Sequence, residues 1–87
     1  MKISGRQVAA ARSLLNWSQD HLAEAAEVNK HTIFRWESGH TTPHQSTVDR
    51  IVKAIEDCGV EFINGGQPGV RFKAKPGTAA EHESAGE

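Results

Sequence analysis

The stretch from residue 19 to residue 36, QDHLAEAAEVNKHTIFRW, constrains the fold more than any other part of the chain. Its apolar residues follow two helical stripes that are separated by a break of a few positions. The stripes consist of Leu22, Ala23 and Ala26, and of Val28, Ile33 and Trp36. Ser18 precedes the first stripe and Asn29 follows Val28 in the second, and each carries a side-chain oxygen that can cap a helix N-terminus. The stretch therefore predicts two short helices that pack at a sharp angle.

An earlier helix carries a charged residue in an otherwise apolar face. Residues 4–7, SGRQ, have the form of a capping box and predict where this helix begins. Its inward face carries Val8, Ala11, Arg12 and Leu15. A guanidinium on such a face needs a counter-charge, and Glu37 lies four residues after Ile33, on the inward face of the later helix. We therefore predict an ion pair between Arg12 and Glu37.

Beyond residue 39 the pattern predicts a loop, a further helix and two short strands. Pro43 marks the loop, and residues 46–49, STVD, form a weaker capping box that predicts a helix ending near Cys58. Residues 60–63, VEFI, and 70–72, VRF, have strand composition and flank a run of turn formers. A lone hairpin is marginal in water, so these strands should pack on the helices or pair with a second copy of the chain. Of these two alternatives we favour the second copy.

Length and charge limit the classes of protein that the chain can represent. Its 87 residues allow one domain with a small core, which makes a catalytic cleft between two lobes improbable. The formal net charge is -1, so a DNA-binding protein of this composition must concentrate its basic groups on one face. The single Cys58 excludes an internal disulfide, and no apolar run approaches the roughly 20 residues that span a bilayer. We expect a cytoplasmic protein without a membrane anchor.

The positions discussed so far resemble the helix-turn-helix of phage repressor and Cro-like regulators, often called the xenobiotic-response-element family. The matching positions are Gln19, Leu22, Ala23, Ala26, Val28, Ile33, Trp36 and the closing Glu37-Ser38-Gly39. The resemblance covers about residues 4–59. It implies a mainly α fold, namely a four- to five-helix repressor-like domain with a short C-terminal β-strand or hairpin, and it also implies the pairing of Arg12 with Glu37. Glu27 departs from the family, which favours glycine there because the turn commonly takes a positive φ.

Three segments follow from this interpretation. Residues 1–59 form the helix-turn-helix DNA-binding domain, and residues 60–73 form short strand segments that are a candidate dimerisation element. Residues 74–87 are small, polar or acidic, and we expect a disordered acidic tail there because too little apolar surface is available to offset the entropy of ordering.

The second helix of the motif, residues 30–38, is predicted to enter the major groove of double-stranded DNA. Its outward residues Lys30, His31, Thr32 and Arg35 are then the candidate base contacts. Arg35 can donate to O6 and N7 of guanine with two hydrogen bonds, and the methyl group of Thr32 can meet thymine. Phe34 has three alternatives, because it can pack on the next helix, contact the sugar backbone or remain exposed.

Candidate phosphate contacts surround this helix. Gln19 lies at a helix N-terminus, where its amide and the free backbone N–H groups suit a phosphate, as does the matching glutamine of the family. The full set of candidates is Gln19, Arg6, Asn29, Thr41 and Thr42. His40 and His44 add positive charge only when they are protonated, so phosphate contacts from them predict tighter binding towards pH 6.

The sequence also allows two competing functions. An enzyme or metal protein would recruit His31, Glu37, His40, His44 and Cys58, but Pro43 interrupts the spacing of the histidines and Cys58 lacks a CxxC partner. We therefore predict no catalytic residue, no metal and no cofactor. A protein-binding module, such as an antitoxin or co-regulator, would dock another protein through residues 60–72. The favoured prediction is a DNA-binding transcriptional regulator, a repressor by resemblance, that acts as a homodimer.

Overall fold

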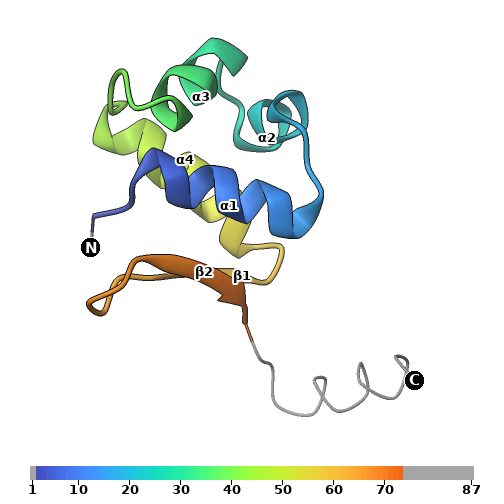
Figure 1. The fold of residues 1–87 in the computed structure, drawn as a ribbon. Helices are drawn as coiled ribbons and strands as arrows, with labels where there is room; N and C mark the ends of the chain where they lie inside the picture. The colour runs from blue at the N-terminus through green and yellow to red at the C-terminus, as the bar shows by residue number, and fades with distance from the viewer. Residues whose placement is uncertain (1, 74–87) are drawn as a thin grey trace.

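The computed structural model describes residues 2–73, which fold into four helices followed by a two-stranded hairpin (Figure 1). The elements are α1 (Gly5–Leu15), α2 (Gln19–Ala26), α3 (Lys30–Glu37), α4 (Gln45–Glu56), β1 (Val60–Ile63) and β2 (Gly69–Phe72). The predicted fold class, mainly α with a short C-terminal hairpin, is confirmed. The predicted tail of residues 74–87 lies outside the described residues.

The first three helices begin where the sequence predicts. The Ser4 hydroxyl accepts a hydrogen bond from the backbone N–H of Gln7, and the Gln7 side-chain oxygen accepts one from the backbone N–H of Ser4, which completes the capping box. Ser18 caps α2 by accepting from the N–H of His21 at 3.0 Å, and Asn29 caps α3 by accepting from the N–H of His31 at 2.7 Å.

The predicted N-cap of the fourth helix, Ser46, is wrong by two residues, and its predicted end near Cys58 is wrong by about two. α4 begins at Gln45 after His44, which makes no side-chain cap, so residues 46–49 already lie inside the helix and do not form a capping box. His44 is the N-cap without a side-chain hydrogen bond, so the helix begins before the chain reaches the Ser46 hydroxyl. At its other end α4 stops at Glu56, and a turn through Cys58 leads into β1.

The turn between α2 and α3 has the backbone geometry that the family resemblance implies. Glu27 adopts φ 58° and ψ 48°, a left-handed conformation that costs a residue with a side chain about 1 kcal/mol relative to glycine. Asn16 takes the same conformation at the end of α1, where an asparagine tolerates it better. The short turn allows α2 and α3 to pack directly on one another.

The core is one contiguous cluster to which every helix and the hairpin contribute. Its fully buried large side chains are Val8, Leu22, Ile33, Ile51, Ile55 and Val60. Small residues lie where helices approach each other, as the methyl of Ala23 does on the inward side of α2. Burial of these apolar side chains stabilises the domain by about 1.5 to 3 kcal/mol for each large residue.

The hairpin packs on the helices of its own chain. β1 and β2 are antiparallel, with Phe62 opposite Val70, and the side chains of Val60 and Phe62 enter the core beneath α1 and α4. Gln7, which is buried, donates its side-chain amide to the carbonyl oxygens of Ile63 and Gly69 at 3.2 and 3.1 Å. Packing on the helices is therefore present, and pairing with a second copy stays a prediction.

Candidate nucleic-acid interface

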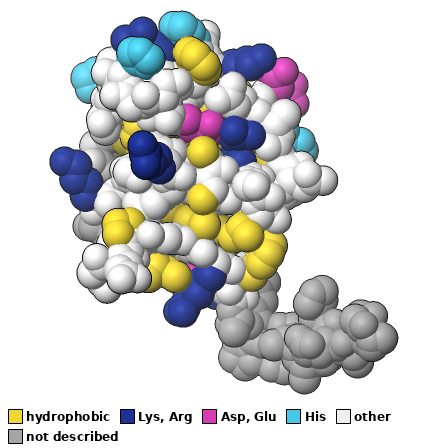
Figure 2. Space-filling view, in the orientation of Figure 1, with side chains coloured by type: hydrophobic (Ala, Val, Ile, Leu, Met, Phe, Trp, Pro, Cys, Tyr) yellow, Lys and Arg dark blue, Asp and Glu magenta, His cyan; other side chains and the backbone are white. Residues whose placement is uncertain are grey.

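α3 is held by one side and exposed on the other. Ile33 and Trp36 are buried against the rest of the domain. Lys30 and His31 are exposed on the opposite side, while Thr32 and Arg35 are half-buried. Figure 2 shows Lys, Arg and His side chains gathered at the end of the molecule where α3 lies. The near-neutral chain thus presents donors at one end, as a DNA-reading surface requires.

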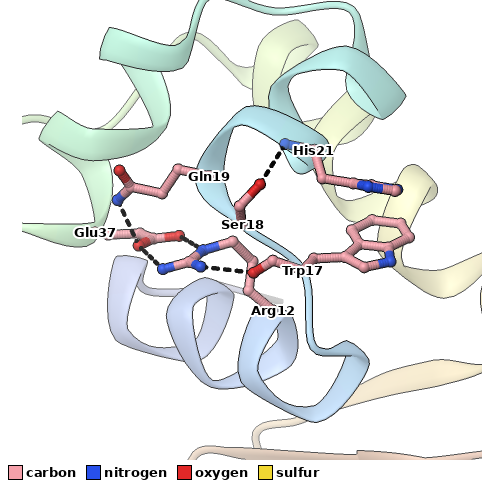
Figure 3. Close-up of polar contacts among 6 residues, drawn as sticks. All are labelled: Arg12, Trp17, Ser18, Gln19, His21 and Glu37. Atoms are coloured by element: carbon pink, nitrogen blue, oxygen red, sulfur yellow. Dashed lines mark hydrogen bonds and ion pairs between the residues drawn. The ribbon is translucent and has the colours of Figure 1, made fainter.

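A polar cluster fixes α3 relative to the two preceding helices (Figure 3). Arg12 donates to Glu37 with two hydrogen bonds, Nε to Oε2 at 2.8 Å and Nη2 to Oε1 at 2.9 Å. Its Nη1 donates to the backbone oxygen of Trp17 at 2.8 Å. Gln19 of α2 donates its side-chain amide to Glu37 Oε1 at 3.0 Å. One carboxylate on the last turn of α3 therefore binds groups from both α1 and α2.

The cluster is largely removed from water. The Glu37 side chain is 7% exposed and that of Arg12 is 20% exposed. The hydrogen bonds that Arg12 donates to Glu37 raise the pKa of the Arg12 guanidinium, and the Coulomb attraction of the carboxylate adds to them, whereas burial acts in the opposite direction. The fork of two parallel hydrogen bonds sets the angle between α1 and α3 more tightly than a single contact can.

Gly5 is a second contact between α1 and α3, and no periodic pattern in the sequence indicated it. A Cβ atom built on Gly5 would lie 1.8 Å from the backbone oxygen of Trp36, which is far below any allowed contact. The first turn of α1 therefore approaches the backbone at the end of α3 closely enough that only glycine fits. Gln7, whose amide joins α1 to the hairpin, was likewise recognised from sequence only as part of the capping box.

The predicted phosphate contacts divide into two groups. Gln19 and Asn29 already have partners inside the protein, because Gln19 donates to Glu37 and Asn29 caps α3. Arg6, Thr41 and Thr42 are exposed. The two threonines follow α3 and line an open pocket together with residues of the N-terminal segment and the hairpin turn. They are free to bind an external group, whereas Gln19 offers its amide oxygen and its second N–H.

Two side chains on the outward side of α3 have neighbours that bear on DNA binding. Lys30 Nζ lies 3.2 Å from Asp20 Oδ1, and both side chains are exposed. Phe34 is 47% exposed, which removes the first of its three alternatives, and its ring lies 6.3 Å from that of His31 in a stacked arrangement. One candidate base contact, His31, therefore lies beside an exposed aromatic ring.

The residues considered for an enzyme or metal site do not assemble. Within residues 2–73, no group of three or more His, Cys, Asp or Glu side chains is placed to hold a metal ion. Glu37, one of those candidates, is instead bonded to Arg12 and Gln19. Over the same part of the chain, no helix is both long and apolar enough to cross a membrane.

The two helices joined by the left-handed turn at Glu27, with the second one exposing donors, define a helix-turn-helix domain. Comparison with protein families supports this class, because a helix-turn-helix family model of the Cro/C1 type matches residues 8–63. The chain therefore belongs to this helix-turn-helix family, whose members are DNA-binding regulators. A search of curated proteins finds no match to the chain.

Proposed function

We propose that the protein is a sequence-specific transcriptional regulator, a repressor, that inserts residues 30–38 into the major groove of DNA. The observation that carries the proposal is the way in which α3 is attached to the rest of the domain. Its last turn is fixed by Glu37 to α1 and α2, while its first turn leaves Lys30 and His31 exposed to solvent. A helix held in this way can present the same donors to a duplex at a constant angle.

Each outward side chain has a distinct role in the proposed complex. Arg35, one turn beyond the start of α3, donates to O6 and N7 of a guanine. Lys30 and His31 donate to base acceptors near the helix N-terminus, and the Thr32 methyl contacts thymine. Phe34, which is 47% exposed on the same helix, contacts sugar or a thymine methyl in the proposed complex.

The phosphate contacts come from both sides of α3. Thr41, Thr42 and Arg6 donate to the backbone of one strand, and Gln19 and Asn29 lie at the N-termini of α2 and α3, where free backbone N–H groups favour an anion. A single domain reads few base pairs, so we further propose a homodimer that binds two half-sites about one helical turn apart.

Selection of bound fragments from a random DNA pool, followed by titration with the selected duplex, tests the proposal. Arg35→Ala should weaken binding by about 1 to 3 kcal/mol and relax sequence preference at one base position. Gln19→Ala should weaken all sequences alike, because a phosphate contact carries no base information. Selection that recovers no common motif, or loss of the same base preference in both variants, would contradict the assignment.

A protein-binding module, such as an antitoxin or co-regulator, is the second candidate function. The observation that favours it is the C-terminal hairpin, whose Phe72 is 57% exposed. Salt dependence separates the two functions. Each phosphate contact lowers the slope of log K against log salt by about 0.9, whereas apolar docking of a protein has little slope.

A further inference from the structure

A surface formed by α1 and β2 combines exposed apolar side chains with a strand edge. Three large apolar side chains are exposed among residues 2–73, and they are Leu14 (38%), Phe34 (47%) and Phe72 (57%). Phe34 belongs to α3, but Leu14 and Phe72 belong to α1 and β2, which pack side by side. Figure 2 shows apolar side chains gathered at the level of α1 and the hairpin.

The alignment of α1 with β2 brings Leu14 and Phe72 to the same level. Gln7 Nε2 donates to the Gly69 oxygen at 3.1 Å, which fixes one point of contact, and the two elements run in the same direction (Figure 1). Leu14 lies seven residues beyond Gln7 on the same helix face, a rise of about 10 Å. Phe72 lies three residues beyond Gly69, also about 10 Å along the strand. Ala10, which is exposed, and Val70, which is half-buried, lie between these levels.

The free edge of β2 presents backbone groups that have no strand to pair with. The backbone N–H of Lys73 donates to the Gly59 oxygen, so Gly59 and Lys73 form a hydrogen-bonded pair of the hairpin. Glu61 and Arg71, two residues further along each strand, form the next hydrogen-bonded pair in this register. Because the pattern alternates, Val70 and Phe72 direct their N–H and C=O groups away from β1. The described part of the chain forms a sheet of two strands, so nothing in it pairs with this edge.

We infer that a second copy of this chain pairs antiparallel with β2, forming a four-stranded sheet across the dimer; the inference specifies the homodimer of the proposed function and rests on it. One register uses all four outward groups, with Val70 of each copy opposite Phe72 of the other. A register centred on Val70 would set Phe72 against Pro68, which has no N–H, and one centred on Phe72 would set Arg71 against Lys73.

The register with Val70 opposite Phe72 also balances the charges of the two copies. It brings the Arg71 side chains of the two copies together at the two-fold axis, which is unfavourable alone. Each Arg71 is already ion-paired with Glu61 of its own hairpin. The row across the dimer therefore reads acid, base, base, acid and has no net charge. Val70 and Phe72 then bury apolar surface on the α1 side of the sheet, beside Leu14.

This mode of pairing suits a protein that reads DNA with α3. The two-fold axis of an antiparallel strand pair runs perpendicular to the sheet. In Figure 1 the hairpin lies on one side of α1 and α3 lies on the other. A rotation about the sheet normal therefore leaves the α3 helices of both copies on the same side of the dimer, where one face of a duplex can meet both.

Sedimentation of the full chain without DNA tests the surface. The native chain should be a dimer in the micromolar range, and Phe72→Lys should raise its dissociation constant at least about tenfold. Val70→Pro should do the same, since it removes an outward N–H that β1 does not use. Phe34→Lys makes the same substitution at another exposed phenylalanine, in α3, and it should leave the dimer intact.

Binding to duplexes with one and two half-sites separates this inference from the proposed function. Phe72→Lys should bind a single half-site as the native chain does and lose the tighter binding to the paired site. A native chain that sediments as a monomer at all concentrations, or a dimer that survives both hairpin variants, would overturn the surface. A dimer that breaks as expected but binds no DNA would support the surface and contradict the DNA-binding proposal.

Discussion

Ile33, Trp36 and Glu37 on the inward side of α3 are buried or nearly so, whereas Lys30, His31 and Phe34 on its other side face solvent. Both sides belong to one helix of eight residues, yet they depend on different kinds of interaction. The side chains on the inward side have their partners within the protein, through apolar contacts and through the hydrogen bonds that Glu37 accepts from Arg12 and Gln19. The outward side leaves most of its donors to an external acceptor.

Because of this difference, the stability of the domain and its specificity for DNA should respond to different substitutions in this helix. A substitution on the inward side alters the free energy of unfolding and the angle of α3, so it should affect binding to every DNA sequence. A substitution on the outward side should leave unfolding unchanged and alter only the contacts to DNA. Substitutions on the two sides of α3 should therefore differ in their effects on unfolding and on DNA binding.

The largest effect is expected from Glu37→Ala. Removal of the carboxylate leaves Arg12 without its counter-charge in a site where that side chain is 20% exposed, and it should cost about 3 kcal/mol of stability. Thermal or urea unfolding measures the change. Asp57→Ala is the matched control, because it breaks the exposed ion pair with Lys53 and should shift unfolding far less. Equal shifts in the two variants would show that the inward side has no special dependence on its ion pair.

Gly5→Ala should destabilise by about 2 kcal/mol, because its Cβ would force the first turn of α1 away from the backbone oxygen of Trp36. Urea unfolding gives the cost, and DNA titration should show weaker binding to all sequences as α3 loses its support. Gly65→Ala adds the same methyl group where no atom lies within 4 Å, and it serves as the control. Native stability in Gly5→Ala would mean that α1 and α3 can separate at little cost.

The smallest effect is expected on the outward side, from Asp20→Asn. The change removes the carboxylate that lies 3.2 Å from Lys30 Nζ, so the lysine becomes available and a negative charge beside the DNA is lost. DNA affinity should rise by about 0.5 kcal/mol at low salt and return towards the native value as salt screens the charge. Asp57→Asn, which removes the same charge at the end of α4, should leave affinity unchanged. An unaltered affinity in Asp20→Asn would place Lys30 away from the duplex.

Much of the fold could be predicted because its signals are local. Capping side chains mark the starts of α1, α2 and α3, and apolar spacing marks their inward faces. The ion pair of Arg12 with Glu37 was predictable for a related reason, since two charged residues each lay on a face that periodicity marked as inward. α4 was placed less well because no side chain caps its start.

Other features depend on segments that are distant in the sequence and meet only in the folded domain. The need for glycine at Gly5 arises from the backbone at Trp36, and the role of Gln7 arises from carbonyl groups more than fifty residues away. The attachment of Gln19 to Glu37 was missed for the same reason, because a glutamine at a helix start is equally suited to a phosphate.

The helix-turn-helix, its inward stripes and the donors of α3 could be predicted from the chain alone, since they follow from local spacing and capping. The tertiary structure decided which of those polar groups are already bonded inside the protein, and that α1 separates the hairpin from α3. Periodicity reports which face of an element is buried, but the partner on that face is set by the packing of the whole chain.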